Sequence, residues 1–341
     1  MNWTKNYADL PQEICAEIEY AGVFYSKEYA NLQEKYHAHA AYIYDDFYIW
    51  VVFLKQKICF RYAFLPVECI ARVVPCVETQ REFLNKAMHV LQTEFKCQWA
   101  GPTSVAALFC SAPDGSKKIP FGSHVVDLQQ TTEEIWSHIH SKHRNVIRRA
   151  EKDGVSVRFG NSSEMLEQYM VLDEQTWKRS GKTSSTRREI EPLLHYMREN
   201  TVIYLAEKDG EPQAGAVFLY SSAMSYYMYG ATKSDPTLGA ANLLQWRAML
   251  DMKERGIAAY SFVGCRFQED KTSKYHSIQR FKARFGGEVK RGVMFKCIFN
   301  QRMYNLSCWL VRILRNHGKA LSPDIIEQEY AKWDSQGTST M

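Results

Sequence analysis

A run of basic residues near the middle of the chain is the first feature that could do chemistry. The segment SKHRNVIRRAEKDG (141–154) places Arg144, Arg148 and Lys152 four residues apart, with only Glu151 and Asp153 to oppose them. On a helix such cations share a face and repel one another unless an anion lies near. A phosphate-rich partner would relieve the repulsion, and a solvated face of a stable helix is the alternative interpretation.

The lysine of FKARFGGE (281–288) is the candidate catalytic group. Phe281 and Phe285 are four residues apart, so we expect both to anchor a helix in the core and Lys282 to point away from them. Acyl transfer to an amine passes through a tetrahedral intermediate whose oxygen gains charge, and a fixed cation or N–H group stabilises it. The alternative is a surface lysine beside two core aromatics.

Two further groups of side chains invite a functional interpretation. Tyr227 and Tyr229 alternate along SYYMYGAT (225–232), so they should share one face of a strand, where they either hold a peptide or sugar or pack in a core. The residues His138, His140 and His143 lack a Cys or carboxylate that would complete a tetrahedral site, so we expect no metal. No Cys–His or Ser–His spacing indicates a nucleophile.

The elements that must position these residues follow an α+β pattern in both halves. In the first half we expect helices over 12–20, 27–37 and 77–96, three strands within 40–65, and a strand over 104–112. In the second half we expect strands over 124–128, 154–160, 201–208, 214–221, 223–232, 258–264 and 292–300, and helices over 131–154, 162–179, 189–199 and 239–256.

The segment SAPDGSKKIPFGS (111–123) concentrates Pro, Gly and Ser and is predicted to be a linker. We therefore expect an N-terminal domain over 1–122, a C-terminal domain over 123–300, and an amphipathic helix with a tail over 301–341. Residues 305–320 place five large apolar side chains on one helical face, with the basic residues off it. An interfacial helix on anionic lipid and a helix docked on the protein's own core both fit, and we favour the second.

The composition narrows the class of protein. The chain has 341 residues, of which 45% are hydrophobic and 24% charged, which excludes a disordered or low-complexity protein. The net charge of +5 permits a nucleic-acid partner without requiring one. Nine scattered Cys indicate reduced thiols in a cytoplasmic protein. No apolar run is long enough to span a membrane, and the N-terminus lacks a signal-peptide pattern.

The second half resembles the C-terminal domain of the Fem peptidoglycan-bridge aminoacyltransferases and the BioF2-like acyltransferases of the GNAT superfamily. The resemblance covers about 125–300 and is carried by SKHRNVIRRAEKDGVSV (141–157), YLAEKDGEPQAGAVFLY (204–220), SYYMYGAT (225–232), NLLQWRAMLDMKERGIAAYSFVG (242–264) and FKARFGGE (281–288). It implies two tandem GNAT-like domains with mixed, mostly antiparallel sheets flanked by helices, and no long helical-arm insertion.

The resemblance also implies roles for individual residues. It places a catalytic lysine at Lys282, with Phe281, Tyr227 and Tyr229 on the substrate side, and an arginine that grips a diphosphate at Arg187 or Arg188. The set expected to bind the donor or its phosphates is Arg144, Arg148, Lys152, Gly239 and Asn242.

Two departures from the family patterns matter. KSDPTLGAANLL (233–244) keeps only Gly239 where an acetyl-CoA loop needs several glycines, which argues against ordinary acetyl-CoA chemistry. In SKEYANL (26–32), Asn31 stands near the point where the Fem pattern has a lysine, which puts the usual nucleotide-diphosphate acceptor in doubt.

The function that fits these observations is transfer of an aminoacyl group, from aminoacyl-tRNA, to an amine of a cell-envelope precursor such as a peptidoglycan stem peptide. No tightly bound cofactor is expected, and the protein would work in the cytoplasm or at the inner face of the membrane. One alternative is an acyl-CoA-dependent N-acyltransferase acting on an amino sugar of a surface polysaccharide. A second is a non-catalytic GNAT-like binding scaffold.

Overall fold

The computed structural model of the chain describes residues 1–179, 184, 186–267, 274–314 and 323–336. Its contacts divide it into a first unit of Met1–Glu17, Gln33–Gly122 and Arg291–Met341 and a second unit of Ile18–Leu32 and Ser123–Lys290. Residues 18–32 thus group with the second unit and residues 291–341 with the first, whereas the sequence suggested contiguous domains.

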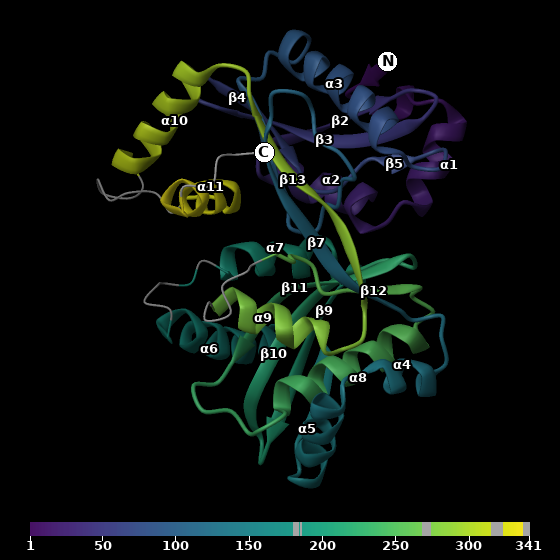
Figure 1. Cartoon of the computed structure of the whole chain (residues 1–341), viewed down its shortest axis with the longest axis vertical. Coiled ribbons are helices and arrows are strands. Elements are labelled where there is room, and N and C mark those ends of the chain that lie inside the picture. The colour runs from purple at the N-terminus through teal and green to yellow at the C-terminus, as the bar shows by residue number, and fades with distance from the viewer. Residues whose placement is uncertain (180–183, 185, 268–273, 315–322, 337–341) are drawn as a thin grey trace. The chain divides into compact units, whose positions relative to one another are not determined.

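The first unit is built on a mixed sheet (Figure 1). Its strands are β1 (Asn2–Thr4), β2 (Ala38–Tyr44), β3 (Tyr48–Lys57), β4 (Phe60–Leu65), β5 (Ile70–Ala71), β6 (Trp99–Thr103) and the end of β13 (Glu288–Ile298). The order is β1-β2-β3-β4-β6-β13, antiparallel except where β4 and β6 run parallel, and β5 pairs with β3. Helix α3 (Val77–Thr93) connects the two parallel strands and buries Phe83, Leu84 and Leu91 against the sheet.

The second unit repeats this plan (Figure 1). Its strands are β8 (Ser156–Gly160), β9 (Thr201–Lys208), β10 (Glu211–Tyr220), β11 (Met224–Thr232), β12 (Ala259–Ser261) and the end of β7 (Lys117–Asp127). The order is β8-β9-β10-β11-β12-β7, antiparallel except where β11 and β12 run parallel. Helix α8 (Ala240–Glu254) connects the two parallel strands.

Helices cover both faces of the second sheet. On one face α8 packs with α4 (Thr132–His138) and α5 (Ser141–Lys152), and on the other face lie α6 (Ser163–Arg179) and α7 (Arg187–Tyr196). The strands are apolar on both sides, and six successive residues of β9 are buried, because each side faces a helical layer. Helix α9 (Lys274–Ala283) adds Phe281 and Phe285 to the α8 side.

The two units share one order of elements. The chain up to Thr103 runs β1, α1 (Gln12–Tyr20), α2 (Lys27–Lys35), β2, β3, β4, α3 and β6, although residues 18–32 of this stretch group with the second unit. The later stretch runs β8, α6, α7, β9, β10, β11, α8 and β12. In each, the last strand joins its sheet parallel to the strand that precedes the connecting helix. The predicted fold class is therefore confirmed: tandem α+β units with mixed, mostly antiparallel sheets. The longest described helices, α3 and α6, have 17 residues each.

Three local predictions were wrong. The expected linker over 111–123 is largely strand β7, in which Ile119 and Phe121 are each 1% exposed, because Pro120 and Gly122 alternate with these apolar residues instead of ending the strand. Residues 104–112 form turns and a single bridge rather than a strand. The expected helix over 131–154 is broken into α4 and α5 at His140, whose ring caps α5 by accepting from Lys142 N at 3.1 Å.

The C-terminal part holds two described helices, α10 (Gln301–Leu314) and α11 (Ile325–Gln336), and the sequence interpretation missed the second. Lys296, which is 2% exposed, ties α11 to β13 through ion pairs of 2.6 Å to both Asp324 and Glu327. Residues 315–320 of the predicted amphipathic helix lie outside the described residues. Among the described helices, none combines the length and apolar character that crossing a bilayer requires.

Candidate functional site

The parallel pair β11 and β12 defines the candidate site. Ligands of α/β sheets bind beyond the carboxyl ends of parallel strands, beside the start of the connecting helix. Pairing between β11 and β12 covers only Met224–Tyr226 and Ala259–Ser261, so the rest of β11 continues without β12 as its neighbour. A cavity of about 270 Å³ lies there, lined by Thr176, Ala214, Gly215, Tyr227, Gly230, Ala231, Thr232, Ala241, Leu244, Gln245 and Phe281.

A β-bulge separates the two candidate tyrosines. Val217 pairs with Tyr229 and the next residue, Phe218, pairs with Tyr227, so Met228 is the extra residue. Tyr227 therefore packs on the α8 side, while Tyr229 packs on the α6 side and donates to Glu189 at 2.9 Å. The expectation that they share a face was wrong, because alternation holds only in a regular strand.

Tyr227 is the tyrosine that reaches the cavity. Burial raises its pKa to about 12, so its hydroxyl stays protonated. Its ring stacks on Phe218 at 5.4 Å, and a Cβ atom at Gly230 would lie 1.8 Å from its hydroxyl oxygen. Gly230 thus leaves the space that this side chain fills.

Lys282 is buried, although the sequence suggested an exposed position. Its side chain leaves α9 toward the segment that follows β12, where Nζ donates to the carbonyl oxygens of Val263 (2.5 Å) and Gly264 (3.2 Å). The neighbouring Phe281 lines the cavity, and Phe285 is fully buried against Phe262. The two phenylalanines are core anchors as expected, but the helix does not send Lys282 to solvent.

The turn that holds Lys282 has an unusual backbone. Val263 has φ +39° and Gly264 has φ +56°, and a β-branched residue in the left-handed region is a clear outlier. Such conformations persist only where surrounding contacts compensate, and here they aim two successive carbonyls at one ammonium group. An ammonium group has three N–H bonds, and the described residues accept only two of them.

The surroundings of Lys282 disfavour its charge. Burial lowers its pKa to about 8, and no carboxylate of the described residues lies within ion-pair distance. Burial, together with the Lys282 charge, also lowers the pKa of His124. The Nε2 atom of His124 lies 3.7 Å from Cys265 Sγ, while its buried Nδ1 lacks a partner among the described atoms.

Sequence reasoning missed Gln245. It is 2% exposed on α8, its Oε1 accepts from the Tyr260 hydroxyl at 2.5 Å, and it lines the cavity. In the described residues nothing accepts from its Nε2, so the amide offers a donor to a ligand. The signal was weak, because the apolar run LLQWRAML (243–250) holds two polar residues, Gln245 and the exposed Arg247.

The basic helix α5 uses most of its predicted donor-binding cations internally. Arg144 donates to the carbonyls of Trp136 (3.3 Å) and Ser137 (2.7 Å) at the end of α4. Arg148 lies over the Trp136 ring at 5.4 Å. Arg144 and Arg148 thus make contacts within the protein, whereas Lys152 stays exposed at the end of the helix.

The start of α8 also has a packing role. Gly239, at φ +83°, caps the helix without a side-chain hydrogen bond, and a Cβ atom there would lie 2.2 Å from Val146 O of α5. The glycine therefore lets α5 and α8 approach, which explains it without a bound phosphate. Asn242 follows in the first turn and is half-buried.

Arg187 and Arg188 begin α7, outside the lining of the cavity. Arg187 makes two hydrogen bonds of 2.6 Å to Glu167 of α6, and Arg188 is exposed. The histidines are dispersed as well: His140 caps α5, and His143 is buried against Phe281 and Phe285. No cluster of three or more His, Cys, Asp or Glu suited to a metal occurs in the part of the chain that the structure describes.

Comparison with known proteins identifies the class of the second unit. Residues 137–276 match a family model described as an acetyltransferase (GNAT) domain. The structure of FemX superposes on 90% of this chain and 99% of its own, with a TM-score of 0.65 and 15% sequence identity. The predicted resemblance to the Fem and GNAT families is thus confirmed.

Curated relatives match part of the chain. The lipid II:glycine glycyltransferase of Staphylococcus haemolyticus is 25% identical over 135 residues, which is 39% of this chain and 32% of the relative. The enzyme of the same name from Staphylococcus aureus is 28% identical over 141 residues, 41% of this chain and 31% of the relative. The match therefore spans about a third of the length of these relatives.

The role of Gly239 can be tested with a matched glycine. Gly210 also has positive φ, +78°, but a Cβ atom there meets nothing within 4 Å. Gly210→Ala should cost only backbone strain, about 1 kcal/mol, whereas Gly239→Ala should cost about 3 kcal/mol or more because it adds a clash with Val146 O. Urea unfolding measures both, and equal losses would contradict the packing role.

The burial of Lys282 predicts a pH-dependent stability. Its folded pKa of about 8 lies below its ordinary value of 10.5, so the unfolded chain binds more protons between these values and stability rises with pH there. Relative to Lys282→Met, the wild-type protein should gain about 2 kcal/mol between about pH 7.5 and about pH 9.5. Denaturant unfolding at both pH values checks this, with the exposed Lys142→Met as control. A constant difference would contradict the buried position.

Proposed function

We propose that this protein is an acyltransferase that moves an aminoacyl group to an amine of a cell-envelope precursor such as a peptidoglycan stem peptide. The observation that carries the proposal is Lys282, a buried ammonium group held by two carbonyls of the turn after β12 and next in the chain to Phe281, which lines the cavity. Its third N–H bond is the donor for the developing oxyanion.

The reaction needs little covalent help from the protein. The acceptor amine attacks the ester carbonyl, and the carbonyl oxygen becomes an oxyanion. The amide then forms as the ester C–O bond breaks, and the donor's leaving oxygen takes up the proton that the amine loses and departs as a hydroxyl group. Holding the two reactants together supplies several kcal/mol of the barrier, up to about 7–11 in intramolecular models. The Tyr227 hydroxyl and the Gln245 amide orient the reacting group within the cavity, and Phe281 closes one wall.

The donor in this proposal is aminoacyl-tRNA, and no tightly bound cofactor takes part. The named activity of the glycyltransferase relatives, glycine transfer to lipid II, supports an aminoacyl donor and a lipid-linked acceptor. Lys152 and the remaining exposed part of α5 meet the donor's phosphates, and Asn242 faces the end of the donor. Arg187 or Arg188 meets the acceptor only if it exchanges its present contacts. The site of action is the cytoplasmic face of the membrane.

The alternative donor, acyl-CoA, is tested by acetyl-CoA. An acetyl-CoA loop needs several free backbone N–H groups before its helix, whereas Gly239 is the one glycine there and is occupied by packing against α5. Calorimetry should show no saturable binding near micromolar concentrations. Saturable micromolar binding would reverse the ranking in favour of an N-acyltransferase.

The catalytic role of Lys282 is tested by Lys282→Met, which keeps the length of the stem and removes the charge. With a mixture of labelled aminoacyl-tRNAs and a lipid II acceptor, turnover should fall about 100-fold, equivalent to roughly 2.7 kcal/mol. The exposed Lys86→Met on α3 of the first unit, outside the proposed donor surface, should retain wild-type turnover. The ratio of wild-type to variant turnover should decline as pH rises through about 8, because Lys282 then loses its proton.

A Lys282→Met protein with near-normal turnover would refute the catalytic role. If the wild-type protein transfers no donor class yet binds the acceptor, the non-catalytic scaffold replaces the enzyme.

A further inference from the structure

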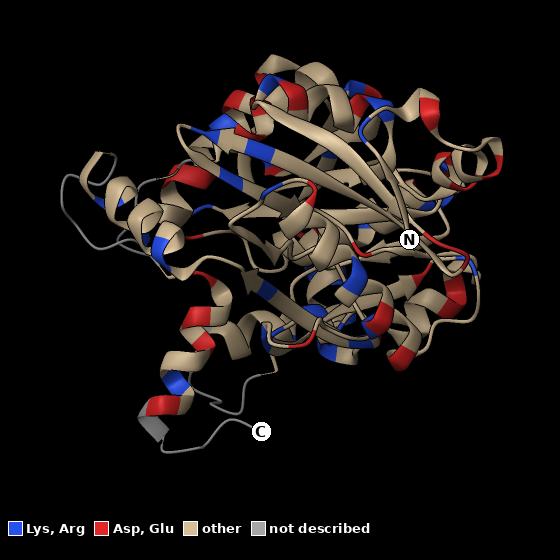
Figure 2. Ribbon diagram, turned by 90° about the horizontal axis from the view of Figure 1, so that it is seen from above, with Lys and Arg blue, Asp and Glu red and all other residues tan. Residues whose placement is uncertain are grey.

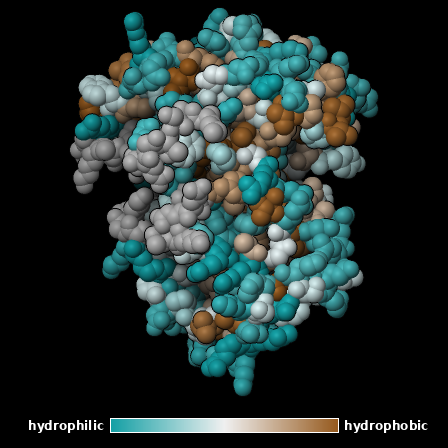
Figure 3. All heavy atoms as spheres, in the orientation of Figure 1, coloured by the Kyte–Doolittle hydropathy of each residue, from teal (hydrophilic) through white to brown (hydrophobic). Residues whose placement is uncertain are grey.

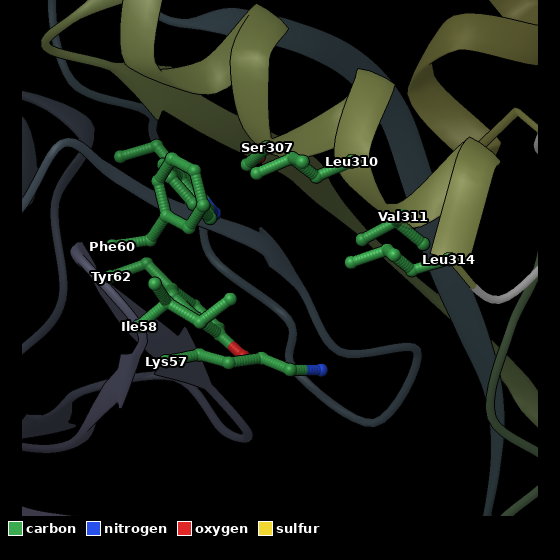
Figure 4. Close-up of a pocket in the computed structure, with 9 residues that line it drawn as sticks. Lys57, Ile58, Phe60, Tyr62, Ser307, Leu310, Val311 and Leu314 are labelled. Carbon is green, nitrogen blue, oxygen red and sulfur yellow. The ribbon is translucent and has the colours of Figure 1, made fainter.

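An apolar groove lies in the first unit between α10 and the hairpin of β3 and β4. It has a volume of about 220 Å³. Figure 4 shows Leu310, Val311 and Leu314 extending from α10 across from Ile58 and Tyr62 of the hairpin. Part of α10 therefore packs on the rest of the unit, where Tyr304 meets the ring of Trp99 at 5.5 Å, while Leu310, Val311 and Leu314 line the open groove.

The other half of the apolar face of α10 is uncovered. Leu306 is 42% exposed, Trp309 55% and Ile313 44%, and Leu314 at the groove is 67% exposed. Across the groove, Ile58 occupies the tip of the hairpin with a positive φ and is 71% exposed. Figure 3 shows apolar side chains, in brown, among the atoms of this region. A group of large apolar side chains in water marks an interaction surface.

The charged residues of α10 and of the groove are all cationic, while Asp324 and Glu327 at the start of the neighbouring α11 are paired with Lys296. Helix α10 contains Arg302 and Arg312 and no acidic residue, so its ribbon in Figure 2 carries blue and no red. Lys57 adds a third cation beside Ile58, at the groove. Trp309 has the amphipathic ring that gathers at membrane–water interfaces.

We propose that α10 and the tip of the β3–β4 hairpin bind the surface of an anionic lipid bilayer, with α10 lying in the headgroup plane. Its apolar stripe and Ile58 then enter the acyl boundary, while Arg302, Arg312 and Lys57 meet the headgroup phosphates. A second copy of the chain is disfavoured, because it would bring the same cations face to face. The surface belongs to the first unit, so the inference does not depend on the transfer chemistry.

The test is flotation with phosphatidylcholine vesicles, with and without phosphatidylglycerol. The wild-type protein should bind the phosphatidylglycerol vesicles, bind the neutral ones less, and lose affinity as salt rises. The double variant Trp309→Ser, Ile313→Ser should lose at least about tenfold in affinity. The control is Val171→Ser, which removes an equally exposed apolar side chain from α6 (57% exposed) and should bind as wild type.

A charge variant gives an independent arm. Lys57→Gln with Arg302→Gln leaves the apolar stripe intact and should lower affinity about fivefold or more at low salt. Transfer to a water-soluble acceptor peptide should be unchanged in both variants, which separates this surface from the proposed enzyme activity.

Three outcomes would overturn the proposal. They are absence of wild-type binding to anionic vesicles, unchanged binding in both variants, and a wild-type dimer that the serine variant dissociates without any effect on vesicles.

Discussion

The candidate site depends on one interaction, the hydrogen bonds from the Lys282 ammonium group to the carbonyls of Val263 and Gly264. Those carbonyls converge because two successive residues adopt left-handed backbone angles at the end of β12. Without the cation, two carbonyl dipoles would face one another in a buried turn. Without the turn, the ammonium group would be buried with no acceptor, which costs several kcal/mol. The Lys282 ammonium group and the turn of Val263 and Gly264 therefore require each other, and their hydrogen bonds hold α9 against this turn.

The topology that the two units share explains why a ligand cavity forms beside the crossover between two parallel strands. In both, a helix returns the chain to a parallel strand, but only in the second unit does the first strand, β11, continue beyond its pairing with its neighbour. In the second unit the gap beyond this pairing is lined by Gly215, Gly230 and three alanines, which leave room for a ligand, and by Tyr227 and Gln245, which give it polarity. In the first unit the helix α3 buries its own Phe83 against large side chains of the sheet such as Tyr48. The same topology thus yields a cavity in one unit and a solid core in the other.

The order of elements, the tandem fold and the motif that contains Lys282 could be predicted from the sequence, since these rest on long periodic segments. It failed where an element departs from its ideal period. The extra residue Met228 places Tyr227 and Tyr229 on opposite faces, and the cap at His140 splits one predicted helix into two. The burial of Lys282 was not predictable either, because its direction depends on a left-handed valine 19 residues away in the chain. Gln245 was hard to single out, because α8 carries other polar residues, such as Asn242 and Arg247, and only the structure shows which of them is buried at the cavity.

The buried lysines Lys296 and Lys282 differ in their partners, and this difference indicates why Lys282 is buried. Lys296 is buried for structural reasons: it meets two carboxylates, and although burial opposes its charge, the hydrogen bonds to Asp324 and Glu327 raise its pKa. Lys282 is buried to a similar degree but meets only neutral carbonyls among the described residues, so its pKa falls. A lysine that only held the fold together would gain stability from a carboxylate partner or from replacement by an apolar side chain. Among the described residues no carboxylate competes for the Lys282 cation, so its attraction for a new negative charge is undiminished. That is the property an oxyanion-stabilising group requires, and it is obtained at the expense of stability.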